Sequence, residues 1–160
     1  MVEVKQKEAV GRRTREVDST CTSGVRIDIA AGKHAMATDE PEERGGTDTA
    51  AAPLEMLNAS LAACQTVQIV KVAEAMRFNH GAINIHAEAT TDLVDGIEGN
   101  NNGVMQFVAA GLVIEIETDE SEKRLERLKA LSEDRCPVGR LFEDAGAEVK
   151  IAWNVLPMKG

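Results

Sequence analysis

The sequence predicts a mixed α+β fold in which helices flank an antiparallel sheet. Three observations support this class: short segments in which apolar residues alternate with polar ones, a long segment with helical spacing, and a second helical block near residues 121–144. Strands that follow one another as hairpins, and helices that occur in separate blocks, are typical of α+β proteins. The chain has 160 residues, which suits one domain, so we expect a single domain over residues 1–160.

The N-terminal region is expected to contain an arm followed by a hairpin. Residues 1–20 are polar and alternate weakly, which indicates a strand or an extended arm. Residues 25–29 alternate apolar and charged side chains, as in a half-buried strand. Residues 31–33, Ala-Gly-Lys, read as a tight turn, and residues 34–37 read as the returning strand.

A charged loop and a long helix follow. Residues 39–53 contain acidic residues, proline and a Gly-Gly pair, which predicts a loop whose acidic run at 39–43 is solvated. Pro53 suits the first position of a helix, and helical spacing continues from Leu54 to about Phe78. Small and apolar residues on several faces indicate a central helix, and Gly81 is expected to be the residue just beyond its C-terminal cap.

The C-terminal half alternates between strands and helices. The expected elements are a strand at 83–90, a turn at 95–103, a strand at 104–117, a helix from 121 that Cys136-Pro137 interrupts, a short helix at 138–144, and a strand at 149–155.

Composition excludes several functional classes. The net charge is −9 and the isoelectric point is near 4.9, which argues against a partner that is nucleic acid or an anionic membrane. Aromatic residues make up only 2%, so platforms for stacking bases are excluded. No run approaches the roughly 18 apolar residues of a membrane helix, and the N-terminus lacks the apolar core of a signal peptide. We therefore expect a cytoplasmic location.

The ionisable residues show no pattern typical of a metal site. The three histidines have no ligand-like spacing, and the three cysteines form no Cys-x-x-Cys pair. We expect no metal and no cofactor. The cysteines, Cys21, Cys64 and Cys136, are odd in number and widely spaced, which excludes a disulfide framework. Structural thiols or redox chemistry remain, and Cys21, in a polar turn, is expected to be incidental.

Cys64 and Cys136 each allow two interpretations. Cys64 lies on the same helical stripe as Leu57 and Leu61, so it is either a small buried hydrophobe or a nucleophile that needs a nearby positive charge. Cys136 precedes Pro137, which places it at the start of the last short helix. There it is either a simple cap or a thiol whose thiolate forms more easily, because a helix N-terminus favours an anion.

Two such thiols indicate a peroxidatic and a resolving cysteine. One thiolate attacks the O–O bond of a peroxide and becomes a sulfenic acid, and the other condenses with it to a disulfide that an external thiol reduces. This chemistry requires Cys64 and Cys136 to meet in the fold, and their spacing alone leaves that question open.

Two segments resemble a known family. Residues 53–64, Pro-Leu-Glu-Met-Leu-Asn-Ala-Ser-Leu-Ala-Ala-Cys, resemble the helix signature of the OsmC/Ohr superfamily of osmotically induced and organic hydroperoxide resistance proteins. Residues 136–140, Cys-Pro-Val-Gly-Arg, resemble its second motif. The loop with Asp-Glu-Pro at 39–41 and Gly-Gly-Thr-Asp at 45–48 is also similar to its members, and the likeness covers most of residues 33–155.

The resemblance implies an OsmC-like fold, in which an antiparallel sheet wraps around a long central helix, and an intertwined homodimer. The apolar faces of the long helix also favour a homodimer, burying more than roughly 2,000 Å². The resemblance further implies a Cys-based hydroperoxide reductase (peroxidase) of the oxidative stress response. Cys64 would be the peroxidatic cysteine and Cys136 the resolving one, with an organic hydroperoxide as substrate and an external thiol or dithiol as reductant.

Two other functions remain open. The alternative is a non-catalytic OsmC-like stress or small-molecule-binding protein, and a third interpretation is a redox sensor in which oxidation of Cys64 alters a partner contact. One departure from the family bears on this choice. In the hydroperoxide-resistance branch a glutamate lies ten residues before the reactive cysteine and pairs with an arginine. In this sequence Leu54 takes that position, and Glu55 lies one residue later.

The departure changes the direction of the acidic side chain. One residue rotates a helix by about 100°, so Glu55 points elsewhere than that branch's glutamate unless the helix starts irregularly. We select Arg44, beside the Gly-Gly pair, as the guanidinium that activates Cys64, with Glu55 orienting it. Four other arginines are alternatives: Arg12, Arg13, Arg15 and Arg26.

Overall fold

The computed structural model describes residues 12–94 and 103–159. The chain divides into two compact units, one up to Pro53 and one from Leu54. Among the described residues, the first unit contains a three-stranded sheet, and the second contains another three-stranded sheet and three α-helices. The predicted mixed α+β class is therefore confirmed, while a single domain over residues 1–160 stays a prediction.

The first unit is an antiparallel sheet in the order β1 (Asp18–Thr20), β2 (Ile27–Ala31), β3 (His34–Thr38). Gly32 has a φ of 60°, in the left-handed region that glycine adopts without strain, so the predicted tight turn is confirmed. The predicted loop that follows contains one 3-10 turn, η1 (Glu42–Arg44). Residues 1–11 of the expected arm lie outside the described residues.

The second unit is a mixed sheet in the order β4 (Ile83–Val94), β5 (Val104–Glu117), β6 (Glu148–Leu156). β4 and β5 pair antiparallel, but β6 runs parallel to β5, so the expectation of a wholly antiparallel sheet is wrong. The reason is the connection: α2 (Glu122–Asp134) and α3 (Pro137–Asp144) lie between β5 and β6, and parallel neighbours need such a crossover. The expected turn at 95–103 lies outside the described residues except for Gly103.

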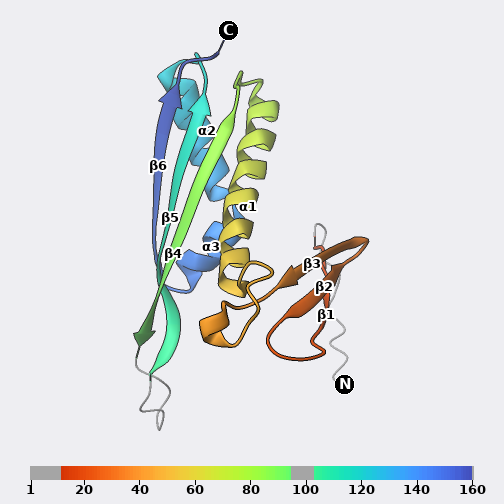
Figure 1. Ribbon diagram of the computed structural model, residues 1–160. Coiled ribbons are helices and arrows are strands. Elements are labelled where there is room, and N and C mark those ends of the chain that lie inside the picture. The colour runs from red at the N-terminus through yellow and green to blue at the C-terminus, as the bar shows by residue number, and fades with distance from the viewer. Residues whose placement is uncertain (1–11, 95–102, 160) are drawn as a thin grey trace. The chain divides into compact units, whose positions relative to one another are not determined.

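The three helices cover one face of the β4-β5-β6 sheet, as Figure 1 shows. The alternation along β5 reflects this arrangement, because Leu112, Ile114 and Ile116 are buried while Val113 between them is 39% exposed. The core also includes side chains from all three helices: Leu61, Ile69, Val72 and Ala73 of α1 (Pro53–Met76), Leu125 and Leu128 of α2, and Phe142 of α3.

α1 buries one stripe and exposes another. Leu61, Gln65 and Ile69, four residues apart, are fully buried, whereas Val67 and Val70 on the opposite side are 46% and 42% exposed. A long helix with exposed valines on its outer side supports the expectation that a second copy covers it, and the homodimer stays a prediction.

The C-terminal end of α1 differs from the expected one. The helix ends at Met76, and Arg77 has a φ of 49°. The Phe78 N–H donates to the Ala73 carbonyl at 2.8 Å, which is the bond that closes a helix with a left-handed residue just beyond its cap. Arg77 therefore takes the place expected for Gly81, and that prediction is wrong.

Arg124 stabilises this end of α1, and its removal is expected to destabilise the protein. Its Nη2 donates to the carbonyl oxygens of Met76 at 3.1 Å and Arg77 at 2.8 Å, and its Nε donates to Glu120 at 2.6 Å. Arg124→Ala should lower the free energy of unfolding by about 1–2 kcal/mol, because it leaves two carbonyl oxygens at a helix C-terminus without their cation. Chemical denaturation measures this. The control, Lys123→Ala on the same helix, should change it by less than about 0.5 kcal/mol, and equal effects would contradict the prediction.

Candidate thiol site

The structure brings Cys64 and Cys136 together within the second unit. Cys64 is half-buried on α1, beside the hydrophobic core, and Cys136 is 2% exposed. The Cys64 thiol lies near enough to Cys136 to help raise the pKa of the Cys136 thiol. All the cysteines are free thiols, and Cys21 lies exposed in the first unit with its Sγ 3.4 Å from the Gly24 carbonyl oxygen.

Cys136 is the N-cap of α3, as its place before Pro137 predicted. Its backbone is extended (φ −82°, ψ 102°), and its Sγ accepts a hydrogen bond from the Gly139 N–H at 3.4 Å. Proline follows at the first helical position, where a missing N–H costs nothing. The local sequence therefore fixes the direction of this thiol.

The ionisation of Cys136 differs from the expectation of an easily formed thiolate. Burial raises its pKa most, the Gly139 N–H lowers it, and Cys64 raises it again through a hydrogen bond and charge repulsion. The net direction is upward, because two N–H groups at a short helix do not offset burial beside a second thiol. Cys136 thus holds its proton more firmly than an ordinary cysteine.

A cavity of about 390 Å³ lies against Cys136. It is bounded by residues of α1, α2, α3, β5 and β6, including Leu61, Gln65 and Arg140. The side chain of Gln65 is 1% exposed, and its Nε2 has no hydrogen-bond partner among residues 12–94 and 103–159. Gln65 was not among the site residues predicted from the sequence, although its place midway between Leu61 and Ile69 marks the buried face of the helix.

Glu55 lies in the first turn of α1 and is exposed. With Asn58, Ala59, Ala62 and Ala87 it lines a separate open hollow on the second unit. Arg44 belongs to the first unit, where its Nη1 lies 3.5 Å from Glu40 Oε2 and its side chain is 63% exposed. The pairing of Glu55 with Arg44, and that of Arg44 with Cys64, both stay predictions.

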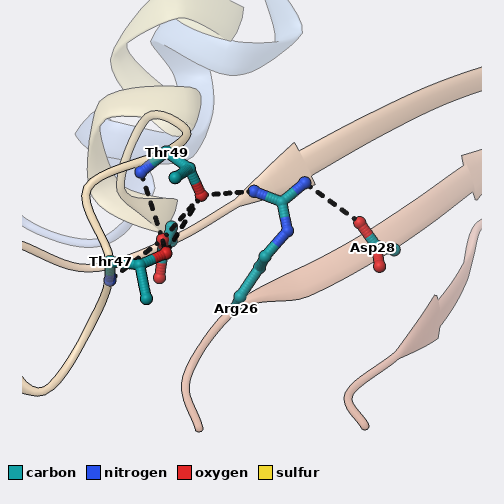
Figure 2. Close-up of polar contacts among 5 residues, drawn as sticks. Arg26, Asp28, Thr47 and Thr49 are labelled. Atoms are coloured by element: carbon teal, nitrogen blue, oxygen red, sulfur yellow. Dashed lines mark hydrogen bonds and ion pairs between the residues drawn. The ribbon is translucent and has the colours of Figure 1, made fainter. Parts of the chain in front are cut away.

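Asp39 organises the loop that contains Arg44. Its carboxylate is 1% exposed, so the expectation that the acidic run at 39–43 is solvated is wrong for this residue. Asp39 Oδ2 accepts from the hydroxyls of Thr47 and Thr49 at 2.6 and 2.9 Å and from their N–H groups at 3.1 and 3.2 Å. Figure 2 shows Arg26 reaching Thr49, with which it bonds at 2.6 Å, and Asp28.

This network predicts an acid-sensitive loop. The Thr47 hydroxyl, with smaller contributions from Thr49 and the Glu40 N–H, outweighs burial and holds the pKa of Asp39 well below its ordinary value. A carboxyl group with a lower pKa in the folded state stabilises the fold above its unfolded pKa, and that stability is lost as the pH falls. Asp39→Asn should therefore flatten the decline in stability between about pH 5 and pH 2. Urea midpoints measured across that range test this, and parallel curves for both proteins would contradict it.

Among residues 12–94 and 103–159, no group of three or more His, Cys, Asp or Glu side chains is arranged to hold a metal ion. His80 contacts the Gly81 carbonyl oxygen through its Nδ1 at 2.9 Å, and His34 and His86 are exposed. Across the same part of the chain, no helix has the length and hydrophobicity needed to cross a bilayer.

Comparison with known proteins agrees with these features. The family model described as OsmC-like protein matches residues 46–152, a segment that includes α1, Cys64 and Cys136. The chain belongs to the OsmC-like family. Its predicted resemblance to the OsmC/Ohr proteins is thus confirmed. No curated protein sequence matches this OsmC-like chain.

Solved structures share the fold of this OsmC-like chain at low sequence identity. An OsmC-like protein from Mycoplasma pneumoniae has a TM-score of 0.70 and 17% identity, covering 92% of this chain and 99% of its own. An organic hydroperoxide resistance protein OsmC from Legionella pneumophila has a TM-score of 0.64 and 19% identity, covering 89% and 98%. An organic hydroperoxide resistance protein from Elizabethkingia anophelis has a TM-score of 0.67 and 15% identity, covering 92% and 98%.

Proposed function

We propose that this chain is a thiol-dependent peroxidase that reduces organic hydroperoxides. Cys64 is the peroxidatic cysteine and Cys136 the resolving one. The observation that carries the proposal is the interaction of these two thiols, which α1 and the start of α3 hold together. The hydroperoxide resistance proteins that share the fold support the same substrate class.

The reaction uses both thiols in sequence. The Cys64 thiolate attacks the terminal peroxide oxygen, the O–O bond breaks, and the alkoxide leaves as an alcohol after taking up a proton, so that Cys64 becomes a sulfenic acid. The sulfur of Cys136 then attacks the Cys64 sulfur and water leaves, which forms the disulfide. An external dithiol transfers two electrons to this disulfide, restores both thiols and becomes a disulfide itself.

The ionisation of Cys136 supports this division of roles. Burial, and then the neighbouring Cys64, raise the pKa of Cys136, so Cys136 favours its protonated form. A protonated Cys136 donates a hydrogen bond to a thiolate on Cys64, whereas the reverse arrangement would place the charge on the more deeply buried sulfur.

Turnover of a bulky hydroperoxide tests the proposal. The full-length protein is mixed with cumene hydroperoxide and saturating dithiothreitol, and loss of peroxide is followed together with oxidation of the dithiol. Over many turnovers we expect one molecule of dithiol to be oxidised for each molecule of peroxide consumed. No turnover above the rate without protein would exclude the peroxidase and favour the non-catalytic stress or small-molecule-binding alternative, or the redox sensor.

Arg44 is proposed to activate Cys64, with Glu55 orienting its guanidinium. Replacing Arg44 with methionine keeps the length of the side chain and removes its charge. Alkylation of Cys64 at neutral pH should then slow by about tenfold or more, because a nearby cation favours the thiolate, the reactive form. Mass spectrometry of the peptide that contains Cys64 measures the rate. An unchanged rate would remove Arg44 from the mechanism and direct attention to Arg12, Arg13, Arg15 and Arg26.

A further inference from the structure

A cavity borders Cys136, one of the two cysteines of the candidate site. Cys136 borders this space, and so does Gly139, whereas Cys64 is not among the residues that line it. Its lining includes the apolar side chains of Leu61 from α1, Leu112 from β5 and Ile151 from β6. A volume of about 390 Å³ is in the range of pockets that hold small organic molecules.

Gln65 indicates that the cavity receives a polar atom. Its side chain is 1% exposed and lines the cavity, and within the described part of the chain its Nε2 has no hydrogen-bond partner. Buried donors are nearly always satisfied, so an unpaired amide beside a cavity marks a place for an acceptor. Because its neighbours Leu61, Leu112 and Ile151 are apolar, this donor would orient a small molecule among them.

Charge at the rim favours an uncharged occupant. Of the described residues that line the cavity, Glu133, Asp134 and Glu143 are acidic and Arg140 is the one cation. Arg140 contacts Asp134 at 3.5 Å and Glu143 at 3.0 Å, and Glu133 accepts from the Trp153 Nε1 at 2.7 Å. Three carboxylates with one guanidinium leave an excess of negative charge, which disfavours an anionic ligand.

We infer that this cavity is the binding site of the reducing dithiol, which attacks the Cys136 sulfur of the Cys64–Cys136 disulfide. The inference rests on the proposed function, since it requires that disulfide. A thiolate of the dithiol bonds to the Cys136 sulfur, the S–S bond breaks, and Cys64 leaves as a thiolate. The second thiol of the reductant then attacks its own bound sulfur and releases Cys136. The reductant closes into a cyclic disulfide, and Cys64 is the first to regain the reactive form.

The substitution Gly139→Ala is expected to narrow the cavity next to the Cys136 sulfur without damaging the helix. A Cβ at Gly139 would lie 3.6 Å from Cys136 Sγ, an ordinary contact, on a residue that lines the cavity. Alanine also has a higher helix propensity than glycine, so Gly139→Ala should fold normally. Ala152→Val, on the exposed opposite face of the sheet, is the matched control for added bulk.

The test uses disulfide made without peroxide. Diamide oxidises the protein, and dithiothreitol is the probe whose reduction rate is measured. Gly139→Ala should slow reduction by about tenfold, because thiol–disulfide exchange depends on access to the sulfur, and Ala152→Val should match the unmodified chain. Gln65→Met should raise several-fold the dithiothreitol concentration that gives half the maximal reduction rate, with little change in the maximal rate itself, whereas a purely structural role would leave that concentration unchanged. Reduction by the anionic dithiol dimercaptosuccinate should be slower than by dithiothreitol.

The attacked sulfur is identified with a monothiol. Oxidised protein is treated with 2-mercaptoethanol and iodoacetamide together, and peptide mass spectrometry should find the mercaptoethanol adduct on Cys136 and the alkyl group on Cys64. The reverse pattern, or unchanged reduction of Gly139→Ala, would overturn the inference, as would failure to form the disulfide. If the disulfide is reduced as expected but the protein does not turn over cumene hydroperoxide, the peroxidase function is refuted and the reductant site still stands.

Discussion

Replacing Cys64 with serine should abolish hydroperoxide reduction, lowering turnover by at least about 1,000-fold. A serine hydroxyl is not ionised near neutral pH and is a poor nucleophile toward an O–O bond, so no sulfenic acid forms. The change removes little volume from a half-buried position, and the fold should persist. Loss of cumene hydroperoxide in the presence of dithiothreitol measures turnover.

Cys136→Ser should separate the two steps. The first peroxide is still reduced, because Cys64 remains, and the sulfenic acid accumulates and is trapped by dimedone. Turnover with dithiol then falls, since the disulfide cannot form. Cys21→Ser is the matched control and should behave as the unmodified chain, because Cys21 is exposed in a turn of the first unit. Normal turnover by Cys64→Ser would refute the assignment of the nucleophile.

Gly46→Ala should give the largest loss of stability among single methyl additions in the loop after β3. A Cβ at Gly46 would overlap the Glu40 carbonyl oxygen, far inside any contact that atoms tolerate. The obstacle is backbone, so the loop itself must move, and with it the Gly46 N–H that donates to the Pro41 carbonyl at 3.1 Å. We expect a loss of about 3 kcal/mol or more, the size typical of severe overpacking.

Gly45→Ala is the matched control for this loop. Gly45 has a φ of 82°, and its Cβ would meet nothing within 4 Å, so only the strain of a left-handed residue, about 1–2 kcal/mol, is expected. Urea denaturation compares the two variants. Hydrogen exchange at Thr47 and Thr49 should accelerate more in Gly46→Ala, because their N–H groups bond to Asp39. Equal losses would contradict the steric argument.

Local chemistry made most of the elements predictable. Pro53 at the helix start, the alternation along residues 104–117, and Pro137 after Cys136 each depend on neighbours within a few residues, and the structure has α1, β5 and α3 at those places. The parallel direction of β6 was not predictable in this way, because it depends on how the crossover through α2 and α3 returns to the sheet. The prediction of where α1 ends was wrong for a similar reason, because Arg124, 48 residues beyond Met76, binds the last carbonyl oxygens of the helix.

The sequence by itself determined the α+β class, the residue at which the long helix begins, and the position of the last helix. It also determined the two cysteine motifs that resemble the OsmC/Ohr proteins. Only the tertiary structure decided which side chains meet. The tertiary structure brought Cys64 close to Cys136 and buried Asp39 among threonine donors. It also placed Gln65, whose Nε2 has no partner among the described residues, on a cavity beside Cys136. Helix and strand patterns arise from short-range backbone geometry, whereas burial and the pKa of Cys136 depend on segments distant in sequence, which a linear pattern does not encode.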